Sequence, residues 1–134
     1  MTAQRVLLDT NVLLRFLLAD HDTLSPRAQT LFRRAAAGEL ELLIPSLIAA
    51  ECVYTLGSFY KMPRADIAAA LTQLLNLPGV EALEGPVLRQ SLNLYATRSV
   101  DFADAYLVAL GQSLGHRIGS FDRDLTKLGA ALLE

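Results

Sequence analysis

Short apolar runs alternate with longer segments of helical periodicity along this chain, and this alternation limits the folds that it can adopt. Strands separated by helices favour a parallel sheet that is covered by helices on both faces. We therefore expect an α/β fold with three layers, α/β/α, around a central and mostly parallel sheet. The expected strands are Arg5–Asp9, Glu41–Ile44, Val80–Leu83 and Arg117–Ser120.

Capping signals indicate where the helices begin and end. Ser25 and Pro26 form an N-cap pair for a helix that runs to Ala37, and Gly38 is suited to end it. Pro45 stops the second strand, so Ser46 is expected to cap the helix that carries Glu51. Further helices are expected over Asn11–Leu18, Arg64–Leu77, Val87–Thr97 and Asp101–Leu114.

The length and composition fit a single domain over residues 1–134. The chain has 134 residues, of which 52% are hydrophobic, enough for one self-supporting core. No window of about 18 apolar residues is present, and the amino terminus lacks a basic region followed by an apolar signal core. We therefore expect a cytoplasmic protein. Cys52 is the single cysteine and is expected to be a buried structural thiol.

Four acidic residues occupy apolar surroundings: Asp9, Glu51, Asp104 and Asp122. An ionised carboxylate in such a place loses hydration worth several kcal/mol, and no basic residue lies within a helical turn of Glu51 or Asp104. If the fold gathers the four, their repulsion calls for a divalent cation. A carboxylate-rich site of oxygen ligands suits Mg²⁺ or Mn²⁺ and is a poor zinc site.

The expected topology can bring these carboxylates to one edge of the sheet. Asp9 and Asp122 follow the first and fourth expected strands, and parallel strands bind ligands outside their carboxyl ends. Glu51 and Asp104 lie near the beginnings of helices, whose positive dipole ends favour carboxylates and phosphates.

Four segments of the chain together resemble the motifs of PIN-domain ribonucleases, most closely the VapC-type toxins of toxin–antitoxin pairs. Each motif contains one of the four acids, and the similarity extends over essentially the whole chain in the right order. The segments are Leu8-Asp9-Thr10-Asn11-Val12-Leu13-Leu14, Ile48-Ala49-Ala50-Glu51-Cys52-Val53, Val100-Asp101-Phe102-Ala103-Asp104-Ala105-Tyr106-Leu107-Val108-Ala109 and Ser120-Phe121-Asp122-Arg123-Asp124-Leu125.

The resemblance implies a metal-dependent endoribonuclease that acts as the toxin of a type II toxin–antitoxin pair. Asp9, Glu51, Asp104 and Asp122 would then bind one or two Mg²⁺ or Mn²⁺ ions. The implied partners are an RNA substrate, a cognate antitoxin protein and a second copy in a homodimer. Two segments rich in apolar residues, 12–18 and 53–60, could line a partner groove or a dimer contact, or pack in the core.

Several polar neighbours have two interpretations each. Asn11 either orients the site by hydrogen bonds or caps the first helix, and Ser120 contributes its hydroxyl to the site or to a strand-end hydrogen bond. Thr10 contributes its hydroxyl or merely starts the helix. Asp101 is a further ligand or forms a capping box with Asp104. Asp124 is expected at the solvated surface.

Two other classes of function remain open from the residues alone. The first is a PIN-like RNA-binding module without cleavage, and the second is a Mg²⁺-dependent phosphoryl-transfer enzyme. The net charge of −2 and the pI of about 5.6 exclude a generally basic nucleic-acid-binding surface. A local basic rim is compatible with them and would draw on Arg15, Arg27, Arg33, Arg34, Lys61, Arg64, Arg98 and Arg123.

Overall fold

The computed structural model describes residues 2–133 and has the predicted α/β architecture. Strands and helices alternate as the sequence indicated, and most boundaries agree within two residues. In chain order the elements are β1 (Gln4–Leu7), α1 (Thr10–Leu18), α2 (Leu24–Ala36), β2 (Leu40–Ile44), α3 (Ser46–Ser58), α4 (Arg64–Leu75), β3 (Val80–Ala82), α5 (Gly85–Thr97), α6 (Phe102–Leu114) and the 3₁₀ helix η1 (Arg123–Leu128).

The sheet has three parallel strands in the order β1-β2-β3, with β2 in the centre. Val6 of β1 pairs with Leu42 of β2, which in turn pairs with Val80 of β3. Four of the five residues of β2 are buried, as a parallel strand covered on both faces requires. No strand within residues 2–133 pairs with the outer edge of β1, and Leu7 on this strand is 65% exposed.

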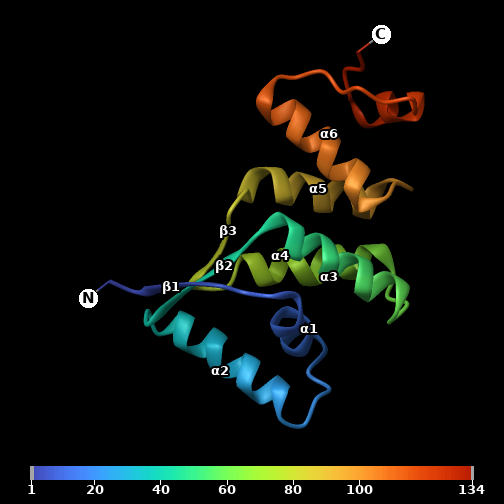
Figure 1. Cartoon of the computed structure of the whole chain (residues 1–134). Helices are drawn as coiled ribbons and strands as arrows, with labels where there is room; N and C mark the ends of the chain where they lie inside the picture. Colours follow the sequence, from blue (N-terminus) through green and yellow to red (C-terminus); the bar gives the residue numbers. More distant parts are fainter. Residues whose placement is uncertain (1, 134) are drawn as a thin grey trace.

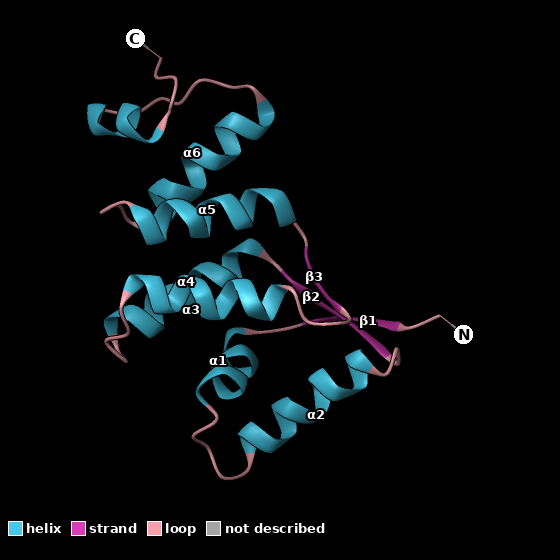
Figure 2. Cartoon of the chain, turned by 180° about the vertical axis from the view of Figure 1, so that it is seen from behind, coloured by secondary structure: helices cyan, strands magenta, loops and turns pink. Residues whose placement is uncertain are grey.

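Helices cover both faces of the sheet. In Figures 1 and 2, α1 and α2 lie on one side of the strands, and α3, α4 and α5 lie on the other. Helix α6 packs against α5 and extends away from the sheet, so the carboxyl-terminal segment lies at the far end of the molecule. None of the helices in residues 2–133 is long and apolar enough to cross a membrane.

Buried apolar side chains form two clusters. The larger one joins the sheet to α1–α5 and includes Leu13, Leu42, Leu56 and Leu88, each with no exposed surface. The smaller one joins α5 and α6 to the carboxyl-terminal segment through Leu94, Ala105, Val108, Ile118 and Leu125. The segment after α6 is therefore held by α6 rather than by the sheet.

The predicted fourth strand, residues 117–120, is wrong. In this region the structure has a single parallel bridge between Ile118 and Leu132. The backbone of Ile118 donates to Ala131 and accepts from Leu133, while its side chain is buried in the smaller cluster. Ile118 is the only large apolar residue of the segment, so its burial against α6 leaves no apolar face for packing into the sheet.

Two predicted caps are also wrong. The N-cap of α2 is Thr23, and the Ser25 hydroxyl inside the first turn donates to the Arg15 carbonyl at 2.7 Å instead. Helix α3 has Pro45 at the N-cap position, so Ser46 is already helical, and its buried hydroxyl has no partner among the described residues. In both cases the helix begins earlier than the capping residue suggested.

Candidate carboxylate site

Asp9 and Glu51 lie on the sheet side of the candidate site. Asp9 follows β1 in an extended conformation and is the N-cap of α1, where its Oδ1 accepts a 3.1 Å bond from the Val12 amide. Glu51 is in the second turn of α3, and its Oε2 accepts a 2.7 Å hydrogen bond from the Thr10 hydroxyl. Thr10 therefore links the end of β1 to α3.

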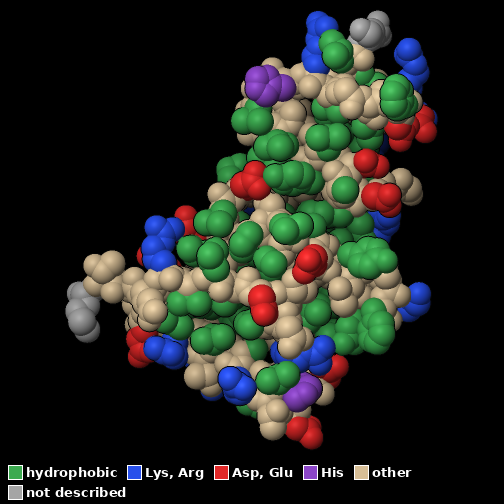
Figure 3. All heavy atoms as spheres, viewed as in Figure 1, with side chains coloured by type: hydrophobic (Ala, Val, Ile, Leu, Met, Phe, Trp, Pro, Cys, Tyr) green, Lys and Arg blue, Asp and Glu red, His purple; other side chains and the backbone are tan. Residues whose placement is uncertain are grey.

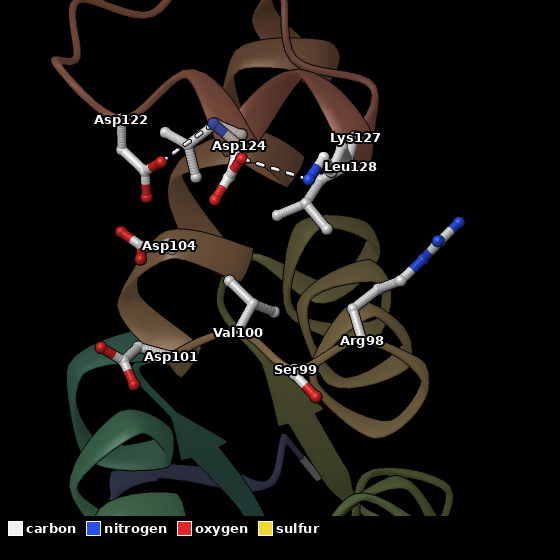
Figure 4. Close-up of a pocket in the computed structure, with 10 residues that line it drawn as sticks. Arg98, Ser99, Val100, Asp101, Asp104, Asp122, Asp124, Lys127 and Leu128 are labelled. Carbon is white, nitrogen blue, oxygen red and sulfur yellow. Dashed lines mark hydrogen bonds and ion pairs between the residues drawn. The ribbon is translucent and has the colours of Figure 1, made fainter.

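Asp101, Asp104 and Asp122 lie on the other side of the candidate site, in one cavity of about 400 Å³. Asp101 precedes α6, Asp104 is in the first turn of α6, and Asp122 is the N-cap of η1, with its Oδ1 2.9 Å from the Asp124 amide. Figure 4 shows their three carboxylates along one side of the cavity, with Arg98 and Lys127 across from them.

The charges of these carboxylates are not balanced by ion pairs. Within residues 2–133, none of Asp9, Glu51, Asp101, Asp104 and Asp122 lies within 4 Å of a basic group. Asp124 differs, because its Oδ1 lies 3.2 Å from Lys127 Nζ and its side chain is exposed, as predicted. Unpaired carboxylates that share a cavity repel one another, and a hard divalent cation would relieve this repulsion.

The structure brings the four predicted acids together as two pairs and not as one cluster. No group of three or more metal-ligating side chains within residues 2–133 is close enough to form a ready metal site. The sequence predicted convergence because it placed Asp122 at the end of a strand in the sheet. Since residues 117–120 pack against α6 instead, Asp122 lies near Asp104 and apart from the end of β1.

The polar neighbours have clear roles in this structure. Asn11 is not the cap of α1, since Asp9 caps it, and Asn11 Oδ1 accepts a 3.3 Å bond from Arg15 Nε. Ser120 Oγ accepts from the Asp122 amide at 3.0 Å, so it orders the turn before η1. Asp101 occupies the N-cap position of α6 without a side-chain cap bond, and the capping box with Asp104 is therefore not formed.

Sequence reasoning missed a contact between Glu84 and Tyr106. The Tyr106 hydroxyl lies 2.8 and 2.9 Å from the two carboxylate oxygens of Glu84, just after β3. Burial, followed by the hydrogen bond and the negative charge of Glu84, raises the pKa of Tyr106. The available signal was the position of Glu84 directly after a strand, as for Asp9. This contact fixes α6 to the carboxyl edge of the sheet.

Cys52, which follows Glu51 in the sequence, is buried, and burial raises the pKa of its thiol to about 12. A thiol with such a pKa stays protonated at neutral pH and is a poor nucleophile. The prediction of a structural cysteine is confirmed with respect to its burial.

The parallel sheet, its flanking helices and the carboxylate-lined cavity define an α/β protein with an acidic, oxygen-rich site. The PIN domain family matches residues 6–131. The chain belongs to the PIN domain family, which indicates nuclease activity in general terms. No curated protein and no solved structure gives a significant match to the chain.

Proposed function

We propose that this protein is an endoribonuclease that depends on Mg²⁺ or Mn²⁺. The observation that carries the proposal is the cavity that Asp101, Asp104 and Asp122 line without ion-pair partners among the described residues. An all-oxygen donor set of this kind suits a hard cation and is unsuited to zinc. Membership of the PIN domain family supports phosphodiester cleavage as the reaction.

Asp9, Glu51, Asp104 and Asp122 are the proposed metal ligands, with Asp101 as a further candidate. When bound, such an ion lowers the pKa of water and stabilises charge on phosphate oxygens. The side chains of the protein would orient the ligands and attract the substrate. Thr10 holds the Glu51 carboxylate in place, and Asp9 keeps one oxygen free because only its Oδ1 accepts the cap bond. Arg98 and Lys127 line the same cavity and would attract the RNA backbone.

The proposal requires that the two pairs of acids approach each other. Two free backbone edges support such an approach. The backbone amides of Gln4 and Leu8 donate hydrogen bonds to the chain of β2. Because backbone groups alternate in direction along an extended chain, those of Arg5 and Leu7 point to the outer edge of β1. The backbone amide and carbonyl of Ile118 form hydrogen bonds with Ala131 and Leu133. The backbone groups of Arg117 and Gly119 therefore point to the opposite side of this segment.

We propose that residues 117–119 pair with β1 in the active state, within one chain or between two copies. The double variant Leu7→Cys/Gly119→Cys tests this directly, since both positions are exposed and the buried Cys52 thiol is unreactive. A disulfide that forms rapidly under mild oxidation is the expected result, and electrophoresis distinguishes a cross-linked monomer from a dimer. Leu7→Cys/Ser113→Cys is the control, because Ser113 is exposed near the end of α6 and cysteine is unstrained there. Equal rates for the two variants would overturn the pairing.

Cleavage of RNA by the purified protein tests the nuclease itself. We expect cleavage with Mn²⁺ or Mg²⁺ and none with EDTA. Asp9→Asn, Glu51→Gln, Asp104→Asn and Asp122→Asn should each lower the rate by roughly a hundredfold or more. Asparagine still caps a helix as well as aspartate does, so Asp9→Asn and Asp122→Asn preserve the local fold. Asp124→Asn is the control, because its carboxylate is already paired with Lys127.

The outcomes separate the three classes of function. A wild-type protein that binds RNA but does not cut it under any metal condition would be a binding module. Activity on small phosphorylated compounds but not on RNA would indicate a phosphoryl-transfer enzyme. Near wild-type cleavage by Asp104→Asn would contradict the proposed ligand set.

We further propose that the protein is the cytoplasmic toxin of a type II toxin–antitoxin pair. The supporting feature is a cavity of about 220 Å³ between α1 and α2, lined by Val12, Leu24, Ala28 and Leu31 with Arg15 and Arg27. This mixture of apolar and basic side chains suits an amphipathic helix of an antitoxin. Val12→Asp should weaken capture of the antitoxin without affecting the metal-dependent melting temperature.

A homodimer is also part of the proposal. Three leucines are exposed: Leu47, Leu83 and Leu107. Leu47 follows Ser46, Leu83 precedes Glu84, and Leu107 follows Tyr106. Leu83 and Leu107 are the chain neighbours of Glu84 and Tyr106, whose side chains are hydrogen-bonded. Figure 3 shows hydrophobic side chains with only scattered acidic ones on the face over α3, α5 and α6. Leu107→Asp should shift the sedimentation coefficient to that of a monomer; an unchanged dimer would refute this contact.

A further inference from the structure

A second cavity lies beside the carboxylate-lined cavity and has a different chemical character. It has a volume of about 590 Å³ and lies between α3 and the beginning of α6, with Tyr54, Tyr95, Phe102 and Arg64 in its lining. Asp101 lines both cavities, so the two are neighbours across one side chain. A chain that crosses the acidic cavity toward α3 reaches the aromatic one next.

Tyr54 lines this cavity but is not part of the hydrophobic core. It is 73% exposed, whereas Val53 and Leu56 of the same helix are buried in the larger cluster. Tyr54 follows Glu51 by three residues, which places both side chains on the same side of α3. An exposed aromatic ring one helical turn from a proposed metal ligand is positioned to contact a bound substrate.

Arg64 supplies positive charge to the same cavity. Its Nη1 donates to the carbonyl oxygens of Tyr95 at 3.2 Å and Val100 at 2.5 Å, and its guanidinium lies 4.3 Å from the centre of the Tyr95 ring. Within the described part of the chain no carboxylate forms an ion pair with Arg64. The guanidinium is thus held by neutral hydrogen-bond acceptors and an aromatic ring, and no ion pair in residues 2–133 offsets its charge.

A planar aromatic surface next to a fixed cation matches the two parts of a nucleotide, its base and its phosphate. We propose that this cavity is a nucleotide subsite for single-stranded RNA, in which Tyr54 stacks on the base beside the scissile phosphate and Arg64 attracts its phosphate. The inference rests on the proposed nuclease function and names the residue that would bias the choice of cleavage position. Stacking on an aromatic ring is tolerant of sequence, so Tyr54 would select unpaired over paired RNA.

Binding of short RNA to a form of the protein that cannot cut tests the subsite. The probe is a fluorescein-labelled, single-stranded 12-nucleotide RNA, measured by anisotropy in Mg²⁺ in the Asp104→Asn background. Adding Tyr54→Ala should weaken binding roughly tenfold, whereas Tyr54→Phe should preserve it. Phe59→Ala is the control, since Phe59 is 75% exposed at the end of α3 but does not line the cavity.

A set of RNAs with a single abasic position separates stacking from a general structural role. One of these RNAs should bind more weakly than the intact RNA to the protein that retains Tyr54. The Tyr54→Ala protein should bind that RNA and the intact RNA with equal affinity. Equal affinity of these two proteins for every RNA would overturn the inference, even if wild-type protein cleaves RNA. Loss of dimer formation or antitoxin capture in Tyr54→Ala, with RNA binding unchanged, would overturn it in favour of a protein contact. If the wild-type protein never cleaves RNA but RNA binding still depends on Tyr54, the nuclease proposal is refuted and the subsite is retained.

Discussion

The hydroxyl of Thr10 donates a 2.7 Å hydrogen bond to the carboxylate of Glu51, 41 residues further along the chain. Thr10 is the first residue of α1, directly after the cap Asp9, and Glu51 lies on α3. This bond fixes the relative position of two acidic residues that come from different elements. A hydroxyl donor does not offset the charge of a carboxylate as an ion pair would, so the bond orients Glu51 without cancelling its ability to bind a cation.

The bond can be removed with little change in volume by Thr10→Val. We expect the free energy of unfolding to fall by about 1 kcal/mol, because the bond is exposed to solvent. Metal affinity should fall together with it, since Glu51 would lose its fixed orientation. Thr10→Ser retains the hydroxyl and should bind Mn²⁺ as the wild type does. Calorimetric titration of the three proteins measures both effects, and equal affinities would show that Thr10 only starts the helix.

Divalent cations should raise the melting temperature of the protein. Four aspartates, Asp101, Asp104, Asp122 and Asp124, line one cavity, so mutual repulsion would oppose folding, and a cation that binds only the folded state would stabilise it by mass action. At a concentration one hundred times the dissociation constant the gain is about 2.7 kcal/mol. Thermal melts in EDTA and in rising Mn²⁺ measure it, with Asp104→Asn as the comparison. Identical curves at every concentration would exclude the metal site.

Gly79 should resist substitution more strongly than Gly38. Both glycines have positive φ angles, +77° and +83°, so alanine is strained at either position. A Cβ at Gly79 would also lie 2.5 Å from the carbonyl oxygen of Ala35, whereas none of the described atoms lies within 4 Å of one at Gly38. Gly79→Ala should therefore cost at least about 1 kcal/mol more than Gly38→Ala in urea unfolding. Equal losses would mean that α2 and the turn before β3 move apart freely.

The raised pKa of Cys52 predicts a loss of stability at alkaline pH. In the unfolded chain the thiol ionises near pH 9.0, while in the folded protein it ionises near pH 12. The stabilising effect of the protonated thiol is complete below pH 9 and is lost as the pH rises from 9 toward 12. The slope is about 1.4 kcal/mol per pH unit in this window. Cys52→Ala should show a shallower decline between pH 9 and 10.5; parallel curves would contradict the effect of burial.

The strands and helices that depend on local patterns were predictable, and the one that depends on tertiary competition was not. Leu42, Leu43 and Ile44 form a continuous apolar run, so β2 follows from the sequence, whereas its central position comes from the structure. Ile118 is the single large apolar residue between Arg117 and Ser120, so its side chain could pack on α6 or on the sheet, and in the structure it packs on α6. Which partner it contacts depends on the packing of α6 on α5, and local sequence does not determine that packing.

The candidate site shows the same division. The acidic residues were identified by their apolar neighbours in the sequence, but the expected loss of hydration is wrong, because Asp9, Glu51 and Asp122 are exposed and Asp104 is half-buried. None of the four forms an ion pair within residues 2–133. Their grouping into two pairs was not predictable, because it follows from the position of residues 117–122. The contact between Tyr106 and Glu84 was missed for a related reason, since α6 and the end of β3 meet only in the tertiary structure.

The toxin proposal predicts that expression of this chain arrests growth and that a partner protein relieves the arrest. An antitoxin that inserts an Arg or Lys between the carboxylates would neutralise charges that otherwise hold metal. Apolar contacts along α1 and α2 would supply most of the affinity, so the complex should survive moderate salt. Co-expression with the adjacent reading frame should restore growth, and the purified pair should not cut RNA. Asp9→Asn is the matched control, because it keeps the α1 cap and removes one charge. Equal growth of cells that express the wild type and Asp9→Asn would reject the toxin role and leave the metal-dependent nuclease to be judged by its own cleavage assay.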